Sequence, residues 1–306
     1  MRKLAVLIPG SPTPAFYSQV AAFTLALRKL PWRRWEPTVY LYLAAIEDVA
    51  ALEHWLPHLE DVQLVFASHA RFDLHGDWVQ TDDRLSLAPR DADVFMAADA
   101  DLLPVALFED VLERVAESDS VAGVIAHYPF PAPDTPREAW ASAADGVLES
   151  PLDFSFSYTL MDSVGHVDVS TPFYVNFGVV FFSRAVYEAM VPAYLDIRRR
   201  LVDRLADPRF AGQVALTFAT EATGVSTTAL PMRFNFPNDP LAKQMYPEDL
   251  EDVRIFHYLR TTDFDRHLIF TSAVEYERFL NLPLVGVNRA FQDAVRSVIG
   301  VDYPFS

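Results

Sequence analysis

The sequence predicts an α/β fold with a mostly parallel, Rossmann-type central sheet flanked by helices. Three observations carry this prediction. As far as residue 127, short apolar runs typical of strands alternate with longer segments of helical periodicity. From 128 to 175 the alternation gives way to sequence rich in proline, serine, aspartate and aromatic residues. Amphipathic segments close the chain. This order indicates a sheet covered on both faces, an irregular insert and C-terminal helices.

The elements of the first half follow one another at regular spacing. Strands are expected at residues 4–9, 38–44, 62–67, 93–98 and 120–127, and helices at 18–30, 48–56 and 107–118, with a further segment around 82–87. In such sheets, ligands bind beyond the carboxyl ends of the strands. The strand at 93–98 leads directly into two carboxylates, so its end is a candidate functional site.

The second half begins with the insert and then resumes regular patterns. Strands are expected at 177–183, 227–231 and 254–259, and helices at 185–205, 211–224, 273–280 and 289–300. No linker and no internal repeat divides the chain. The sequence therefore predicts one domain over residues 1–306, built from a half at 1–126 and a second half at 127–306.

Composition excludes several classes of function. The formal net charge of −17 at pH 7 repels nucleic acid and anionic lipid over most of the surface. The absence of cysteine excludes disulfides, thiolate nucleophiles and cysteine-based zinc sites. No segment reaches the roughly 18 uninterrupted apolar residues of a membrane span, and the N-terminal apolar run is too short for a signal peptide. We expect a cytoplasmic protein without an integral membrane segment, and homo-oligomerisation stays open.

Asp99 and Asp101 are the two carboxylates that follow the apolar stretch VFMAA in the run DADVFMAADADLLPV. The Asp-x-Asp triplet occurs three times in this acidic chain, so the triplet alone is unspecific. This copy differs because it follows a buried-strand pattern. If the chain stays extended, residues i and i+2 face the same side, and both carboxylates can converge on one hard cation. Alternatively, Asp101 caps a helix that begins near Pro104, and Asp99 is a solvated strand end.

The run DVFMAADADLLP resembles the strand and metal motif of GT-A-fold glycosyltransferases. Three further segments resemble, in the same order, motifs of the glycogenin and lipopolysaccharide galactosyltransferase group: YVNFGVVFFSR (174–184), AGQVALTFA (211–219) and TTALPMRFN (227–235). RIFHYL (254–259) then places a histidine where that group keeps its late metal ligand. The resemblance covers residues 1–126 and 174–260. It implies a GT-A-like fold, with 1–126 as the nucleotide-binding half and 127–306 as the acceptor half.

The resemblance also implies the metal ligands and the donor. Asp99, Asp101 and His257 would bind Mn²⁺ or Mg²⁺ against the diphosphate of a nucleotide-sugar donor, with Asp99 also near the donor. One imidazole among oxygen ligands favours Mn²⁺ mildly. A histidine in an apolar run is otherwise a core-edge residue bonded to backbone, and His127 competes with His257 by position.

Two departures separate the chain from that group. Gly212 stands where an aspartate usually precedes the glutamine, and RTTDFDRH replaces the Gly-x-x-Lys-Pro-Trp that often follows the histidine. The lost lysine removes a diphosphate contact. Arg260 or Arg266 could replace it, because a guanidinium binds phosphate bidentately, although a solvated turn explains either arginine equally well.

Further residues are candidates for holding the nucleotide. Pro9, Gly10 and Ser11, with Thr13, form a short polar loop that could wrap the nucleotide or could simply connect two elements. Arg84 resembles a basic residue that approaches the donor in this fold. The alternative for Arg84 is a helix-surface position paired with Asp82 or Asp83.

The stereochemical outcome depends on the residue beside the transferred sugar. Gln213 or Asn176 could place an amide beneath the sugar, as a retaining enzyme requires, and the family-matching position of Gln213 favours that outcome. An inverting enzyme needs a carboxylate base, for which the insert offers Asp145, Glu149, Asp153 and Asp162. The acceptor, whether small molecule, glycan or protein, would lie against the insert and the C-terminal segments. Aromatic residues that also suit a core gather there: Trp140, Phe154, Phe156, Tyr158, Phe173 and Tyr174.

Three functions remain open at this point. A metal-dependent glycosyltransferase of the hexosyltransferase type comes first. A nucleotidyltransferase shares the sheet and the metal carboxylates, but IPGSPTPAFYSQ lacks the basic residue that its first loop usually carries. A non-catalytic GT-A-like nucleotide-binding module would explain the altered glutamine and lysine motifs. No carboxylate pair in the sequence selects a glycosidase.

Overall fold

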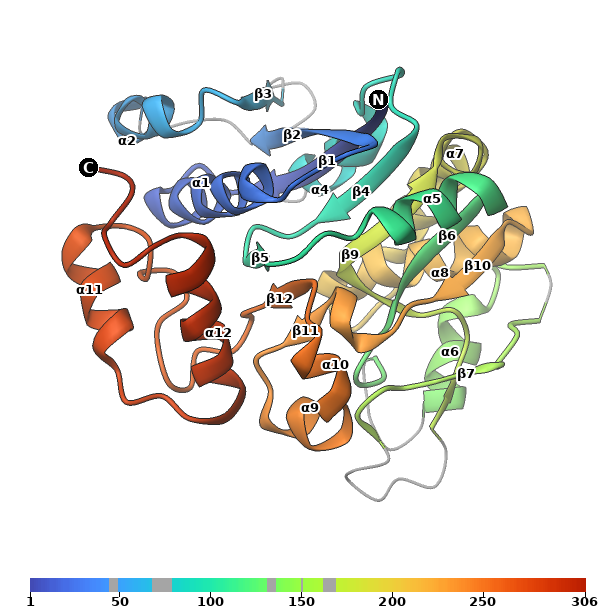
Figure 1. Cartoon of the computed structure of the whole chain (residues 1–306). Helices are drawn as coiled ribbons and strands as arrows, with labels where there is room; N and C mark the ends of the chain where they lie inside the picture. The colour runs from blue at the N-terminus through green and yellow to red at the C-terminus, as the bar shows by residue number, and fades with distance from the viewer. Residues whose placement is uncertain (44–48, 68–78, 131–135, 150, 162–168) are drawn as a thin grey trace. The chain divides into compact units, whose positions relative to one another are not determined.

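The computed structural model describes residues 1–43, 49–67, 79–130, 136–149, 151–161 and 169–306 (Figure 1). Its main sheet has seven strands in the order β10-β6-β9-β4-β1-β2-β3. β1 pairs in parallel with β2, β2 with β3, and β10 with β6, while β9 runs antiparallel to β6. The predicted mostly parallel sheet is confirmed. The strands are β1 (Arg2–Gly10), β2 (Trp35–Leu43), β3 (Val62–Phe66), β4 (Val94–Ala98), β6 (Ser120–Ile125), β9 (Val175–Ser183) and β10 (Ser226–Ala229).

Two smaller sheets complete the described strands. One has three strands in the order β11-β12-β5, and the other pairs β7 with β8. Residues 102–104, which follow the second aspartate, are a strand, whereas the cap alternative placed a helix start near Pro104. That alternative is wrong, because the next helix begins at Glu109. These strands are β5 (Leu102–Pro104), β7 (Phe156–Ser157), β8 (Ser170–Thr171), β11 (Phe236–Pro237) and β12 (Ile255–His257).

The helices begin and end where local chemistry favours it. α1 starts after Thr13, whose side chain accepts from the N–H of Phe16, and Pro14 fits the first turn. Ser183 caps α7 in the same way, and α8 ends at Gly224, which adopts φ 62°. The helices are α1 (Pro14–Lys29), α2 (Val49–Trp55), α4 (Val79–Ser86), α5 (Glu109–Ser118), α6 (Pro136–Ala144), α7 (Arg184–Leu201), α8 (Ala211–Thr223), α9 (Pro240–Met245), α10 (Pro247–Glu251), α11 (Ala273–Asn281) and α12 (Gly286–Val298).

The chain divides into two compact units. Unit 1 comprises Met1–Ala92, Ala97–Glu109 and Met232–Ser306, and unit 2 comprises Asp93–Met96 and Asp110–Pro231. The C-terminal segment therefore belongs to the same unit as the N-terminal part of the chain, whereas the sequence predicts it in the acceptor half.

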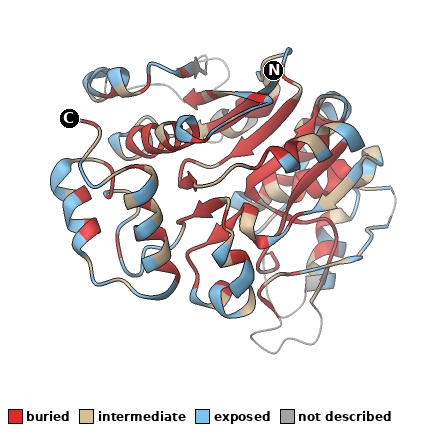
Figure 2. Cartoon of the chain, viewed as in Figure 1, coloured by how far each residue is buried: buried red, intermediate tan, exposed pale blue. Residues whose placement is uncertain are grey.

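Each unit has an apolar interior. In unit 1, the middle of β1 is buried and Trp35 and Trp55 are covered. β4, whose residues are divided between the two units, is buried along its length (Figure 2). In unit 2, the insert contains helix α6, which the sequence analysis did not predict, and Trp140 of α6 is fully buried against Phe130 and Tyr174. Trp140 also packs against Phe218 of α8, so the insert contributes to the core of unit 2. Within the described parts of the chain, no helix has the length and apolarity that crossing a membrane requires.

Glu109 stabilises the junction between β2 and the start of α5. Its Oε1 accepts from the backbone N–H groups of Arg33 (2.8 Å), Arg34 (2.9 Å) and Trp35 (3.3 Å). Burial alone would raise the pKa of Glu109, but these three donors and the charge of Arg34 outweigh burial and lower it. The ionised form is therefore the form that the fold prefers.

Glu109→Gln is expected to lower the free energy of unfolding by about 1 kcal/mol at neutral pH, because the charge-assisted hydrogen bonds become neutral ones. Since the folded-state pKa lies below the ordinary 4.5, this stabilisation is complete above that pH and is lost as the pH falls through the folded pKa. Urea unfolding at about pH 7 and about pH 3.5 should show the difference between parent and variant shrinking on acidification. An equal difference at both pH values would contradict this account of Glu109.

Candidate metal centre

The first two residues of the candidate site are positioned by the end of β4. The strand VFMAA is buried along its length, as suits a central strand covered on both faces, and it ends at Ala98. β5 begins at Leu102, so Asp99 and Asp101 lie in the short connection between two strands. The chain bends there instead of staying extended, yet both carboxylates reach one place.

The third residue arrives through strand pairing within unit 1. β12 pairs antiparallel with β5, and the register sets His257 opposite Leu102. The N–H of Tyr258 donates to the carbonyl oxygen of Asp101 at 3.1 Å. A pairing between distant parts of the sequence therefore fixes the imidazole beside the carboxylates.

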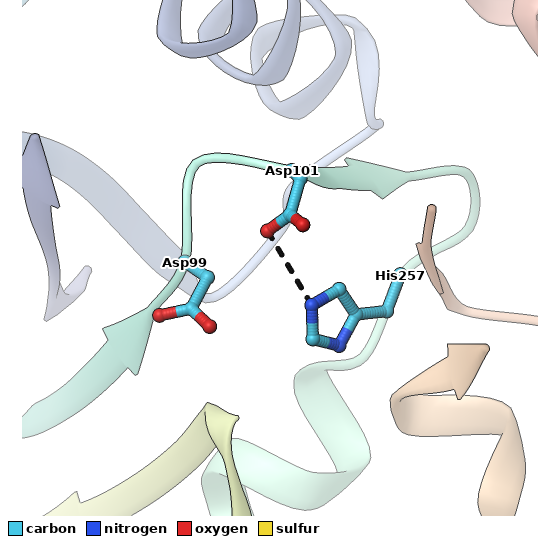
Figure 3. Close-up of side chains that lie close together, drawn as sticks. All are labelled: Asp99, Asp101 and His257. Carbon is cyan, nitrogen blue, oxygen red and sulfur yellow. Dashed lines mark ion pairs between the residues drawn. The ribbon is translucent and has the colours of Figure 1, made fainter. Parts of the chain in front are cut away.

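Asp99, Asp101 and His257 form a compact cluster (Figure 3). One potential ligand atom from each lies within 4.8 Å of the others, and Asp101 Oδ1 is 3.4 Å from His257 Nε2. The side chains of Asp101 and His257 are 12% and 6% exposed, whereas that of Asp99 is 42% exposed, so the cluster is accessible from the Asp99 side. Two carboxylates and one imidazole fit a divalent cation such as Mn²⁺.

Asn235 orients the imidazole. Its Oδ1 lies 2.9 Å from His257 Nδ1, and both side chains are buried. Because an amide oxygen only accepts, Nδ1 carries the proton, which leaves Nε2 on the side of Asp101. Hydrogen bonds of this kind set the tautomer of metal-binding histidines.

The electrostatics of the pair favour charge on both partners. Burial opposes ionisation of Asp101, but the charge and hydrogen bond of His257, reinforced by Arg266, lower the pKa of Asp101 to about 2. Burial likewise opposes the imidazolium, but Asp101 and then Asp99 outweigh it and raise the pKa of His257. Asp101 is thus a carboxylate at every pH near neutrality, as a metal ligand must be.

Two arginines accompany the aspartates. Arg84 Nη1 lies 3.5 Å from Asp99 Oδ1 and 3.3 Å from the carbonyl oxygen of Ala98. Arg84 is only 2% exposed, so it is not the surface residue that one interpretation expected. The guanidinium of Arg266 forms an ion pair with Asp101 Oδ2.

Asn235→Leu is expected to weaken Mn²⁺ binding by about 10–100-fold, because the imidazole loses the acceptor that fixes its tautomer and orientation. Asn235→Asp restores an acceptor of similar size and should recover part of the affinity. Calorimetric titration with Mn²⁺ measures both variants, and melting in chelator checks that they fold. If the leucine variant bound Mn²⁺ as tightly as the parent, Asn235 would have no orienting role.

The other predicted donor residues of unit 1 lie in ordinary structural contacts. Pro9 and Gly10 end β1, and a Cβ at Gly10 would stand 2.7 Å from Leu41 Cδ1, so close packing favours glycine there. Ser11 accepts the N–H of Thr13 through its carbonyl oxygen at 2.8 Å. Arg260 pairs with Asp239 at 2.7 Å, not with the cluster. Their roles in nucleotide binding stay predictions.

Asn176 and Gln213 belong to unit 2. Asn176 lies in β9, and its Oδ1 accepts the N–H of Gly178 at 3.0 Å; Gln213 lies in the first turn of α8. The two elements touch beside these residues, because a Cβ on Gly212 would lie 3.6 Å from Phe177 Cε1. The pair therefore comes from neighbouring parts of one unit.

Gly212 itself has a local explanation. A Cβ there would meet the hydroxyl oxygen of Tyr194 at 3.3 Å, so an aspartate would crowd Tyr194 unless Tyr194 moved. His127, the competing histidine, is in unit 2, where its Nδ1 lies 2.8 Å from Thr159 Oγ1.

The remaining candidates of the insert divide by exposure. Asp145, Glu149 and Asp153 are exposed, and Asp162 lies outside the described residues. Four of the aromatic residues are buried core, as the sequence analysis allowed: Trp140, Tyr158, Phe173 and Tyr174. Phe154 and Phe156 are half-buried.

The other Asp-x-Asp triplets have structural partners. Asp91 pairs with Lys3, and Asp93 Oδ1 lies 3.4 Å from Arg184. Asp263 accepts from Asn288, and Asp265 Oδ1 accepts the N–H of His267 at 2.9 Å. Among the described residues, only Asp99 and Asp101 join a histidine in a cluster able to hold a metal ion.

The fold is shared with glycosyltransferases of known structure. Neither a protein-family model nor a curated protein sequence matches the chain. The galactosyltransferase LgtC, solved with donor and acceptor sugar analogues, aligns over 96% of both chains with a TM-score of 0.55 and 14% identity. Mouse xyloside xylosyltransferase 1 aligns over 85% of this chain and 99% of its own, with a TM-score of 0.51 and 11% identity.

A third structure extends this likeness over the whole chain. The alignment with the glycosyltransferase GlyE of Streptococcus pneumoniae TIGR4 covers 100% of this chain and 66% of the GlyE chain, with a TM-score of 0.51 and 14% identity. The predicted GT-A-like fold, with its mostly parallel sheet, is confirmed. At these identities the likeness establishes the fold, and the site must carry the function.

Proposed function

We propose that the protein is a metal-dependent glycosyltransferase, which moves a sugar from a nucleotide-diphosphate sugar to an acceptor with retention of configuration. The convergence of Asp99, Asp101 and His257 is the observation that carries this proposal. It occurs at the end of a buried strand in a fold shared with LgtC and two other glycosyltransferases. Ligands of open α/β sheets bind at such strand ends.

The cluster suits activation of a diphosphate leaving group. Asp99, Asp101 and His257 would hold Mn²⁺ or Mg²⁺, and the bound cation would neutralise the charge that develops on the departing nucleoside diphosphate. Asn235 holds the imidazole in the tautomer that binding requires. Arg84, placed at Asp99, adds a positive charge beside the diphosphate.

The amides of unit 2 would serve the sugar. Gln213 is proposed to lie beneath the transferred sugar and Asn176 to contact it, with Pro9, Gly10, Ser11 and Arg260 around the nucleotide. The contact between Gly212 and Phe177 supports a shared role of the two amides. The structure of an LgtC variant, in which an active-site glutamine is replaced by glutamate, also aligns with this chain, with a TM-score of 0.55. Retention needs no carboxylate base, so the exposed acids of the insert have no role in it.

A non-catalytic nucleotide-binding module is the second candidate. Gly212, where related enzymes usually carry an aspartate, favours it. Such a module would bind nucleotide through the same cluster but transfer no sugar. A nucleotidyltransferase has less support. The segment from Pro9 to Gln19, which includes the loop after β1, contains no arginine or lysine.

The proposal is tested by melting the protein with nucleoside diphosphates and nucleotide sugars, each with Mn²⁺ and with chelator. A ligand that binds only the folded state raises the melting temperature. We expect one nucleotide to raise it only when Mn²⁺ is present, and that nucleotide's sugars then become substrates for a hydrolysis and transfer assay. Binding without turnover of any sugar would favour the non-catalytic module. No shift with any nucleotide would contradict the proposed donor site.

A further inference from the structure

Both carboxylates of the cluster already have cationic partners. Arg84 lies at Asp99 Oδ1, and Arg266 forms its ion pair with Asp101 Oδ2. A divalent cation that bound both aspartates would meet two guanidinium groups at its ligands. At least one guanidinium must therefore leave its aspartate when the cation binds, or the local charge becomes strongly positive.

The two arginine side chains differ in how easily they can leave their aspartates. Arg84 is 2% exposed and is also bound to the carbonyl oxygen of Ala98. The side chain of Arg266 is 27% exposed and reaches Asp101 from the segment after β12. The buried amide of Gln19 holds the main-chain oxygen of Arg266 at 3.1 Å. The backbone of Arg266 is thus anchored next to the site while its guanidinium can change partners.

We propose that Arg266 is an exchangeable counter-ion of Asp101: it competes with the divalent cation for the carboxylate and, once displaced, binds the diphosphate of the donor. This inference rests on the proposed function. Asp99 and Asp101 balance the charges of Arg84 and Arg266, so adding a divalent cation alone leaves an excess of positive charge. A diphosphate removes that excess, and a freed guanidinium binds it bidentately. Cation and nucleoside diphosphate therefore bind cooperatively, and Arg266 is the residue that couples them.

A purely structural ion pair makes a different prediction. In that case Arg266 would only neutralise a buried carboxylate, and its removal would lower the melting temperature. Removal of a positive charge beside Asp101 tightens cation binding in either role. The nucleoside diphosphate separates the two roles, because only a guanidinium that leaves Asp101 and binds the diphosphate makes its variant bind nucleotide more weakly at saturating Mn²⁺.

The experiment compares Arg266→Gln with the parent and with Arg278→Gln, which removes an arginine that is 70% exposed on α11. Calorimetry first measures Mn²⁺ alone, and then UDP, GDP, ADP and CDP at saturating Mn²⁺. For Arg266→Gln we expect Mn²⁺ alone to bind about tenfold more tightly, and the nucleoside diphosphate about tenfold more weakly. Arg278→Gln should match the parent in both titrations. Melting in chelator confirms that each variant folds.

The outcomes separate this inference from the proposed function. Equal or weaker Mn²⁺ binding by Arg266→Gln would overturn the exchangeable counter-ion while leaving the metal site intact in the parent. A second outcome is that parent and variant bind Mn²⁺ as expected but neither binds any nucleoside diphosphate. That result would overturn the proposed donor site and the diphosphate role of Arg266, but not the competition of Arg266 with the cation. If neither protein bound Mn²⁺ with or without nucleotide, both proposals would fall.

Discussion

Asp101→Asn is expected to weaken Mn²⁺-dependent binding of a nucleoside diphosphate by about 100-fold or more, since it removes the ligand that is buried between His257 and Arg266. An amide of the same shape keeps an oxygen acceptor but loses the charge that holds a divalent cation. The effect should vanish in chelator, because binding without the cation does not use the carboxylate. Calorimetric titration of the nucleotide identified by melting, with Mn²⁺ and with chelator, measures both conditions.

Asp91→Asn is the matched control for this substitution. It changes an aspartate of another Asp-x-Asp triplet, in an exposed ion pair with Lys3, and should leave nucleotide binding at the parent level. Because Asp101 is buried, circular dichroism and melting in chelator must show that its variant folds. Equal affinity of folded Asp101→Asn and parent in the presence of Mn²⁺ would remove Asp101 from the metal site.

Gln213→Ala is expected to lower the rate of sugar transfer by about 100-fold while leaving donor binding nearly unchanged, because an amide that stabilises developing charge acts mainly in the transition state. Gln213 is not a member of the metal cluster, whose three residues all belong to unit 1. Turnover under saturating donor, together with calorimetric donor affinity, separates the two quantities.

Glu221→Gln serves as the control within the same helix. Glu221 lies near the C-terminal end of α8, away from the first turn that carries Gln213, and its neutral replacement should keep the parent rate. A Gln213→Ala enzyme with the parent turnover would show that the amide has no part in catalysis. Weaker donor binding with the parent turnover under saturating donor would assign Gln213 to donor binding instead.

Local patterns predicted the framework because its strands are buried on both faces. The run VFMAA is apolar throughout and became β4, and the apolar runs of β1 and β9 likewise became central strands. Their order predicted the sheet. α6 was missed because proline-rich sequence surrounds it and its buried face depends on contacts of Trp140 with Phe130 and Tyr174.

The site was predictable only where the sequence carries its own signal. Asp99 and Asp101 were found because charge follows a buried strand, and His257 through motif order. The orienting role of Asn235 was missed, although the residue ends the motif TTALPMRFN, because its partner His257 lies on β12, 22 residues further along the chain. The ion pair of Arg266 with Asp101 is equally non-local. Such contacts come from pairing between distant segments, which no local pattern encodes.

The most direct test of the metal centre is an anomalous difference map at the manganese absorption edge, from crystals grown with Mn²⁺ and the nucleoside diphosphate that shifts the melting temperature. We expect one strong peak within coordination distance of Asp99, Asp101 and His257 Nε2, with the diphosphate as a further ligand. Ordered nucleotide with no manganese peak, or a peak bound by other residues, would contradict it.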